Sequence, residues 1–344
     1  MMSNFRRIAF TVGAALMASG VGTSAFAADA PAPKKVAILI FKGVQIIDYA
    51  GPYEVFADAG YDVFTVGATR EAVTTSGGDG HTIAPKYTFA DAPQADIVIV
   101  PGGGGTHAAP STTPAVLDWI RGEALHAERI MSVCSGAFTL ANTGLLEGLK
   151  ATTTAGYIAD LQSQHPTIKV VRDQRVVDNG KLITTAGLSA GIDGALHVIE
   201  VMDDHDFAQT VALGIEYDWR PQGGYARAAM ADRMNPDPDL AAAGDLVDQR
   251  FNGDNDHWEL RDWFKTRLSA ADLLGVVKTA YAKGYAADGP WAARSVRIAD
   301  AGPLATVWRF DDQQGRHWRG ALTVEPVPGA AQKFLVRLTT DRIG

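Results

Sequence analysis

Apolar and amphipathic stretches alternate along the first two thirds of the chain. Four short runs are apolar over most of their length, at residues 35–41, 61–68, 95–100 and 130–133. Helix-like patterns separate these runs, and a further strand, glycine break and helix follow at residues 183–202. Strands that are apolar on both faces are typical of a parallel sheet with helices on both sides. The pattern therefore predicts an α/β fold with a mostly parallel sheet between two layers of helices.

The pattern changes near residue 220. Residues 221–244 are rich in Pro, Gly, Ala and Asp, which is typical of a linker. A helical pattern covers residues 260–285, and alternating apolar and polar positions follow at residues 305–327 and 334–343. Alternation with period two around a polar turn predicts antiparallel hairpins with one apolar face. We therefore predict a small α+β C-terminal domain with antiparallel hairpins at residues 245–344.

Residues 1–27 have the features of a secretory signal peptide. Two arginines precede a stretch of small apolar residues, and an Ala-Phe-Ala tripeptide that ends at Ala27 fits a cleavage site. A membrane anchor is the alternative, but the apolar run is short for a bilayer. The sequence thus predicts a signal peptide at residues 1–27, a leader at 28–34 and the α/β domain at 35–220. It also predicts a periplasmic or secreted protein with no membrane contact after cleavage.

The charge and the cysteine count narrow the range of functions. The chain has 344 residues, a formal net charge of −8 and no long basic run. Such a chain is a poor candidate for binding nucleic acid or an anionic membrane. Cys134 is the only cysteine, so it forms no disulfide within the chain. It is therefore an inert buried side chain, an intermolecular partner or a working thiol.

Three chemically notable segments follow predicted strands. Asp48 follows the first strand, a glycine run at residues 102–105 follows the third, and Cys134 follows the fourth. Ligand sites in open parallel sheets lie beyond the carboxyl ends of the strands. We therefore expect Asp48, the glycine run and Cys134 to meet at one edge of the sheet.

The corner at Cys134 resembles a nucleophile elbow, in which a strand, a nucleophile, a small residue, a glycine and a helix follow one another. Gly136 would allow a close approach of the strand and the helix. The helix N-terminus would favour a thiolate and stabilise a developing anion, with the glycine run as a second donor. Taken alone, the glycine run is equally typical of an ordinary strand-to-helix turn.

The sequence gives a weaker signal for the residue that would act as general acid or base. Cysteine hydrolases commonly pair the thiol with a histidine, but Ser135 follows Cys134 here. Asp48 is the first candidate, because its apolar neighbours would raise its pKa, and Glu54 is the second. For both carboxylates, a capping or first-turn charge of a helix is an equally good interpretation.

A metal site has weaker support. Asp193 and His197 stand four residues apart with Glu200 beyond them, a spacing that fits a metal pair. A surface or capping pair with this spacing is far more common. The sequence therefore predicts no metal and no cofactor.

Four ordered segments resemble the ThiJ/PfpI superfamily, which is related to class I glutamine amidotransferases. They are residues 46–56, 95–105, 132–154 and 184–200, and the resemblance covers about residues 35–220. The most similar branch contains isonitrile hydratases and the amidase-like halves of some AraC-type regulators. No helix-turn-helix pattern is present in the sequence, which argues against the regulator function.

The resemblance implies a flavodoxin-like three-layer sandwich, usually a homodimer, that acts on a small-molecule substrate. It implies that Cys134 is the catalytic nucleophile and that Asp48 is the acid that works with it. Ser135 stands where isonitrile hydratases have threonine, and Gly103 and the N–H of Ser135 would form the anion hole. The implied activity is the addition of water to a small electrophile that contains nitrogen, with no cofactor.

The sequence departs from the family at two positions where many members carry histidine, which are Ser135 and Thr154 here. This departure argues against peptidase or deglycase activity. Two alternatives to a hydratase stay open. One is a non-catalytic redox sensor or small-ligand-binding module, and the other is an amidase-like hydrolase. Beyond about residue 222, the resemblance has no counterpart.

Overall fold

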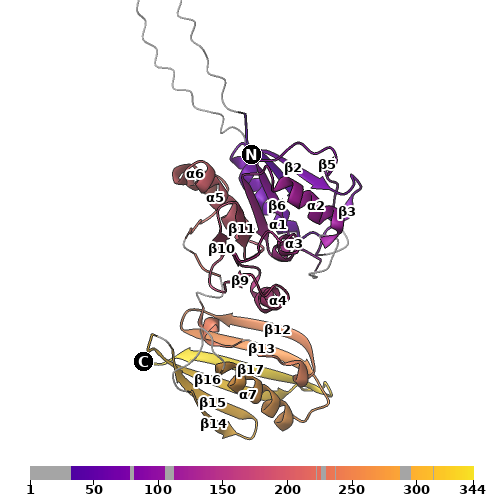
Figure 1. Cartoon of the computed structure of the whole chain (residues 1–344). Coiled ribbons are helices and arrows are strands. Elements are labelled where there is room, and N and C mark those ends of the chain that lie inside the picture. The colour runs from indigo at the N-terminus through magenta and orange to yellow at the C-terminus, as the bar shows by residue number, and fades with distance from the viewer. Residues whose placement is uncertain are drawn as a thin grey trace, which may run out of the picture. The chain divides into compact units, whose positions relative to one another are not determined.

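A mostly parallel sheet organises the first part of the chain (Figure 1). The computed structural model describes residues 32–77, 81–104, 112–221, 223–225, 230–236, 238–286, 296–312 and 314–344. The predicted signal peptide and most of the predicted leader lie outside these residues. Among the residues described, no helix is both long and apolar enough to cross a bilayer.

Seven strands form this sheet, in the order β10-β11-β7-β6-β1-β2-β5. They are β1 (Lys35–Leu39), β2 (Asp62–Gly67), β5 (Tyr87–Thr88), β6 (Ile97–Val100), β7 (Arg129–Val133), β10 (Val176–Asp178) and β11 (Leu182–Thr185). Neighbouring strands are parallel except β10 and β11, which are antiparallel. Strands β1, β6 and β7 lie in the middle and are almost completely buried, which is why they are apolar at nearly every position.

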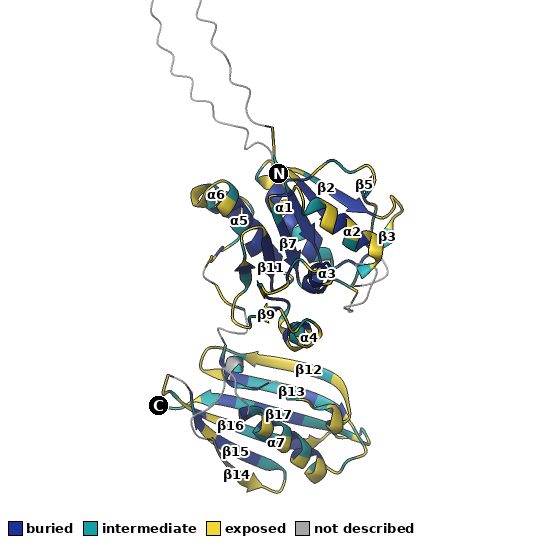
Figure 2. Cartoon of the chain, viewed as in Figure 1, coloured by how far each residue is buried: buried dark blue, intermediate teal, exposed yellow. Residues whose placement is uncertain are grey.

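Helices cover the sheet. They are α1 (Ile46–Asp58), α2 (Pro114–Glu123), α3 (Gly136–Asn142), η2 (Ala155–Tyr157), α4 (Ile158–Gln164), α5 (Ala190–Met202) and α6 (His205–Gly214). Helices α1, α5 and α6 pack against one another and α2 packs against α3, so two groups of helices flank the buried strands (Figure 2). Two short ladders complete this part, β3 (Val73–Thr74) with β4 (Thr82–Ile83) and β8 (Lys150–Ala151) with β9 (Lys169–Val170). The predicted sandwich is confirmed.

The C-terminal part of the chain contains an antiparallel sheet with the strand order β12-β13-β17-β16-β15-β14. Its elements are β12 (Asp245–Gly253), β13 (His257–Lys265), α7 (Ala270–Ala286), β14 (Val296–Gly302), β15 (Ala305–Asp311), β16 (His317–Pro326) and β17 (Lys333–Arg342), after the short helices η4 (Ala231–Met234) and η5 (Ala241–Ala243). Alternate side chains of the sheet, such as Trp308 and Trp318, are buried in a core that also contains Val277 and Tyr281 of α7. The predicted α+β fold with antiparallel hairpins is confirmed.

The predicted helical pattern at residues 260–285 is wrong at its start. Residues 257–265 form β13, in which Trp258 and Phe264 are buried on the core face. Helix α7 begins at Ala270, next to Ser269, whose hydroxyl accepts a hydrogen bond from the N–H of Asp272 (3.1 Å). Aromatic residues favour a strand when they pack on a half-buried sheet, and tertiary packing decides between the two patterns here.

The segment predicted as a linker is anchored at several points. The hydroxyl of Tyr225 donates a hydrogen bond to the carbonyl of Thr153 (2.6 Å) and also contacts the hydroxyl of Thr152. Further along, Ala231 and Met234 are buried in the core of the C-terminal sheet. The boundaries at residues 221 and 244 remain predictions, but residues between them contribute to packing.

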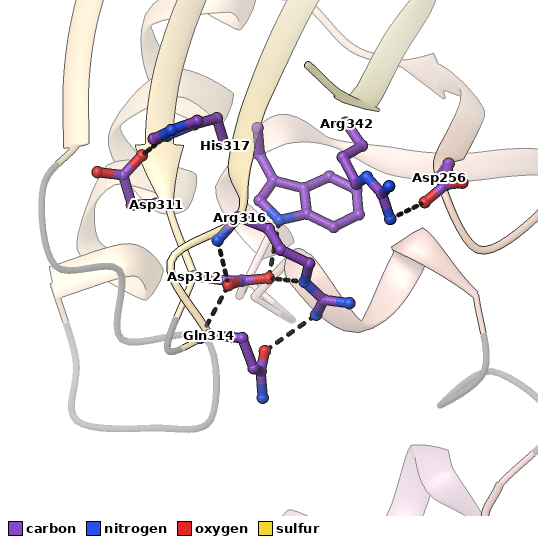
Figure 3. Close-up of polar contacts among 8 residues, drawn as sticks. Asp256, Asp311, Asp312, Gln314, Arg316, His317 and Arg342 are labelled. Atoms are coloured by element: carbon purple, nitrogen blue, oxygen red, sulfur yellow. Dashed lines mark hydrogen bonds and ion pairs between the residues drawn. The ribbon is translucent and has the colours of Figure 1, made fainter. Parts of the chain in front are cut away.

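A buried carboxylate fixes the turn between β15 and β16 (Figure 3). Asp312 accepts hydrogen bonds from Trp318 Nε1 (3.0 Å), from Arg316 Nε (2.6 Å) and from the N–H groups of Gln314 and Arg316 (both 2.9 Å). Burial alone would raise the pKa of Asp312, but these donors hold it below its usual value. The acid is thus a structural anchor of the hairpin.

Gly320 is required because the backbone of β16 contacts the indole ring of Trp308 at this position. A Cβ at this position would lie 2.0 Å from Trp308 Cε2, and the indole is itself buried in the core. We expect Gly320→Ala to destabilise the C-terminal sheet by about 1–3 kcal/mol through overpacking. Urea unfolding followed by tryptophan fluorescence measures this change.

The matched control is Gly275→Ala on α7, where an added Cβ would meet nothing within 4 Å. This substitution is expected to stabilise the helix by about 0.5–1 kcal/mol. Equal effects of the two alanines would contradict the packing described for Gly320.

Candidate active site

Cys134 lies at the sharp corner between β7 and α3. Its φ of 58° is in the left-handed region, which is rare for a residue other than glycine. Two hydrogen bonds, one to the N–H and one to the carbonyl of Cys134, hold this conformation. The N–H of Cys134 donates to the carbonyl of Thr185 (3.3 Å), and its own carbonyl accepts from the hydroxyl of Thr153 (2.8 Å). The thiol is partly buried rather than sealed in the core.

Two glycines make room for this corner. A Cβ on Gly136 would lie 2.0 Å from the carbonyl oxygen of Val100, so only glycine lets α3 start this close to β6. A Cβ on Gly187 would lie 2.9 Å from the Cβ of Cys134 and 3.1 Å from its Sγ. The turn after β11 therefore packs directly against the sulfur. The predicted role of Gly136 agrees with this geometry.

Asp48 faces Cys134 from the first turn of α1 and is completely buried. Its carboxyl group lies close enough to the Cys134 thiol for each group to shift the pKa of the other. It also accepts hydrogen bonds from the N–H of Gly102 (3.1 Å) and the N–H of Leu188 (3.0 Å). Burial raises the pKa of Asp48 to about 6, although the two N–H donors act in the opposite direction. The carboxyl group therefore titrates close to neutral pH.

The thiol does not have the low pKa that the helix N-terminus suggested. Burial raises the pKa of Cys134 to about 12, and the charge of Asp48 adds to the increase. The N–H and the hydroxyl of Ser135 favour the thiolate but are the weaker influence. The direction of this pKa change is opposite to the one that the helix N-terminus alone would give. Asp48 and Cys134 form a coupled pair, which carries one proton from a pH of about 6 up to a pH of about 12.

Ser135 connects the glycine run to the thiol. Its hydroxyl accepts a hydrogen bond from the N–H of Gly103 (3.1 Å), and Ser135 acts to lower the pKa of the Cys134 thiol. An isolated antiparallel β-bridge between Val44 and Gly103 holds the glycine run in place. The structure therefore brings Gly103, Ser135 and Cys134 together, but the N–H of Gly103 is already used by the Ser135 side chain. Gly105 lies outside the described residues.

Other predicted candidates lie apart from the thiol. Glu54 is exposed on α1, on a different side of the helix from the buried Asp48. Asp193 accepts hydrogen bonds from Arg175 and from the hydroxyl of Tyr217, and forms an ion pair with Arg175. The imidazole of His197 contacts two carboxylates, of which Asp178 Oδ2 is at 2.9 Å. No group of three or more metal-ligating side chains occurs in the described part of the chain.

Sequence reasoning missed the groups that contact the pair through their backbone. Gly187 and Leu188 follow β11, and the N–H of Leu188 is a direct partner of Asp48. Thr153 was also missed, although it acts through its side chain: its hydroxyl donates to the carbonyl of Cys134. The glycine break after residue 185 was the available signal, because a glycine at a strand end allows a close approach to another segment.

The pH dependence of Cys134 alkylation tests the shared proton. The reaction of a free thiol with iodoacetamide speeds up about tenfold from pH 7 to 8, since its pKa is about 8.5. For the native protein we expect a slow rate that changes little between pH 7 and 8, because the pair carries one proton throughout this range and the thiol reacts as it passes that proton to Asp48. It should fall as the pH drops through about 6, because Asp48 then takes up a second proton for the pair. The chain unfolded in urea is the control, and a native profile identical to it would contradict the coupling.

Comparison with known proteins identifies the family. The model of the DJ-1/PfpI family matches residues 34–201. Isonitrile hydratase of Pseudomonas putida is 35% identical over 216 residues, which cover 63% of this chain and 89% of the hydratase. A crystal structure of a ThiJ/PfpI family protein from Pseudomonas syringae has a TM-score of 0.50 and 30% identity, covering 56% of this chain and 78% of that one. The chain belongs to the DJ-1/PfpI family.

Proposed function

We propose that this protein is a cysteine-dependent hydratase that adds water to a small isonitrile and releases an N-substituted formamide. The observation that carries the proposal is the completely buried Asp48 carboxyl beside the Cys134 thiol, where each group shifts the pKa of the other. The similarity to a protein named isonitrile hydratase, of which this chain covers 89%, supports the same chemistry. Cys134, Asp48 and Ser135 are the proposed catalytic residues.

The first step adds the thiol across one carbon atom. Cys134 Sγ forms a bond to the terminal carbon of the isonitrile, while the thiol proton passes to Asp48 and from there to the same carbon. The product is a thioimidate in which the carbon carries one hydrogen, the sulfur and a double bond to nitrogen. No proton is taken from or lost to solvent in this step, because the pair supplies the one proton that the carbon needs.

The second step consumes water. Asp48 removes a proton from a water molecule as its oxygen attacks the thioimidate carbon. The carbon–sulfur bond then breaks, the nitrogen gains a proton, and the thiol of Cys134 regains its own. The sum is one isonitrile and one water converted to one formamide, with the pair returned to its starting state.

The titration of the pair suits this sequence. A general acid–base works best when its pKa is near the working pH, and burial brings Asp48 to about 6. A thiol with a raised pKa gives up its proton only as the new bond to carbon forms, and Asp48 is the acceptor in contact with it. The Ser135 N–H and hydroxyl would stabilise the charge that develops on sulfur.

The two alternative functions are less well supported. An amidase-like hydrolase needs donors for an oxyanion, but the N–H of Gly103 is occupied by the Ser135 hydroxyl. A redox sensor needs a thiolate that is easily oxidised, and the pKa of Cys134 is raised instead of lowered. Both arguments favour the hydratase.

We also propose that residues 1–27 are removed on export to the periplasm or medium, and that the mature chain is a homodimer. The apolar N-terminal segment with its small-residue cleavage pattern supports the first point. Intact mass of the secreted protein and its light-scattering mass test these two points. A periplasmic product that begins at Met1, or a monomer at micromolar concentration, would contradict them.

An aryl isocyanide is the substrate that tests the proposed function. Wild-type protein should convert it to the formamide, measured by chromatography. Cys134→Ala should lose all turnover above the uncatalysed rate, and Asp48→Asn should lose about 10²–10⁴-fold, the contribution of general acid–base catalysis.

Glu54→Gln is the matched control, because it removes an exposed carboxylate from the same helix as Asp48. It should keep nearly full activity. Equal turnover by the wild type and Cys134→Ala would rule out the mechanism.

Mild peroxide separates the hydratase from the redox sensor. Because the pKa of Cys134 is raised, we expect no added oxygen on this residue by intact mass under conditions that oxidise a low-pKa thiol. Rapid, selective conversion of Cys134 to the sulfinic acid would instead favour the sensor.

A further inference from the structure

We infer that Arg175 is a positioning residue for the reaction, which holds the turn after β11 so that its backbone meets both Asp48 and Cys134. Its importance for catalysis rests on the proposed function, but its effect on the thiol does not. Arg175 is remote from the thiol in sequence, and it acts through the turn at residues 186–189.

Arg175 contacts this turn at both of its ends. Its carbonyl accepts a hydrogen bond from the N–H of Ala186 (2.9 Å), where β11 has just ended. Its Nη2 donates to the hydroxyl of Ser189 (2.8 Å), at the start of α5. One residue thus holds the first and last residues of a four-residue turn at a fixed separation.

The guanidinium is itself fixed. Arg175 Nε donates to Asp193 in the first turn of α5, and the side chains of this ion pair are only 17% and 11% exposed. The hydroxyl of Tyr217 donates to the other oxygen of Asp193 (3.1 Å). The carboxylate therefore keeps one oxygen for Arg175, which leaves Nη2 aimed at Ser189.

The middle of the turn makes the contacts that matter for the thiol. Gly187 packs against the sulfur of Cys134, and the N–H of Leu188 donates to Asp48 Oδ1 (3.0 Å). Leu188 has a φ of 52°, a strained conformation for a residue with a side chain, and its side chain is 46% exposed. Packing of the Leu188 side chain cannot maintain this strain. Hydrogen bonds can: those of Arg175 at the two ends of the turn, and the one that the carbonyl of Leu188 accepts from the N–H of Gly191 (3.0 Å).

The consequence for Asp48 has a definite sign. An N–H bond to a carboxylate stabilises its charged form, so the bond from Leu188 lowers the pKa of Asp48 against the effect of burial. The titratable group beside Asp48 is Cys134. Arg175 lines a cavity of about 120 Å³, and the other titratable groups that line it are Asp178, Asp193, His197 and Arg220. Relaxation of the turn should therefore raise the pKa of Asp48.

The test compares Arg175→Met and Ser189→Ala with the wild type by the pH profile of Cys134 alkylation with iodoacetamide. For Arg175→Met we expect the acidic fall of the rate to move up by about one pH unit, the size expected for the loss of one hydrogen bond to a charged group. Ser189→Ala removes only the Nη2 contact and should shift the profile in the same direction by less. Arg175→Lys should lie between the wild type and Arg175→Met.

Turnover of the aryl isocyanide gives the second readout. Arg175→Met should lower kcat about tenfold and leave KM within about twofold, because the turn acts on the proton-handling pair. The matched control is Arg70→Met, which removes an exposed arginine that pairs with Asp91 in the same domain. This control should leave both the profile and kcat unchanged.

An unchanged alkylation profile in a folded Arg175→Met protein would overturn the inference. If this variant fails to fold, Ser189→Ala decides, because it keeps the ion pair with Asp193. A shifted profile in a protein that never converts isocyanides would uphold the positioning role and reject the proposed function. The two failures are therefore distinguishable.

Discussion

One proton shared between a buried carboxyl group and a thiol is the constraint around which this site is built. Burial acts against the charged form of both Asp48 and Cys134, so the pair keeps one proton from a pH of about 6 up to a pH of about 12. This arrangement differs from a cysteine activated by a permanent positive charge. In the proposed hydratase, the same pair supplies both the nucleophile and the proton that the substrate takes up.

The parallel sheet makes this pair because three of its strands end at the same place. Asp48 comes from the helix after β1, Gly102 from the loop after β6 and Cys134 from the corner after β7. The fourth segment, after β11, closes the group from the side of Leu188. Each segment contributes one short contact, and the surrounding core keeps the four at a fixed separation. The glycines at residues 136 and 187 are necessary because backbone has to approach backbone there.

Much of this arrangement could be predicted from the sequence, and the reasons for the rest are physical. The central strands could be predicted because burial on both faces requires apolar residues throughout. The meeting of Asp48 and Cys134 could be predicted because each follows a strand of the parallel sheet. The direction of the Cys134 pKa change could not be predicted. It depends on burial and on Asp48, which is distant in sequence, and these outweigh the effect of the adjacent helix N-terminus. Leu188 acts through its N–H, which every residue except proline possesses, so its side chain carries no signal. Residues 260–265 have a helical pattern that packing against neighbouring strands overrides.

The hydroxyl of Tyr225 has a consequence for where this α/β unit ends. It donates to the carbonyl of Thr153, whose side chain in turn supports the carbonyl of Cys134. A tyrosine beyond the last helix of the sandwich is thus linked through Thr153 to the backbone carbonyl of Cys134. A shortened chain that ends at residue 220 would keep every strand and helix of the sandwich and still lack this hydrogen bond, so a fragment that preserves the surroundings of Cys134 extends at least to residue 225.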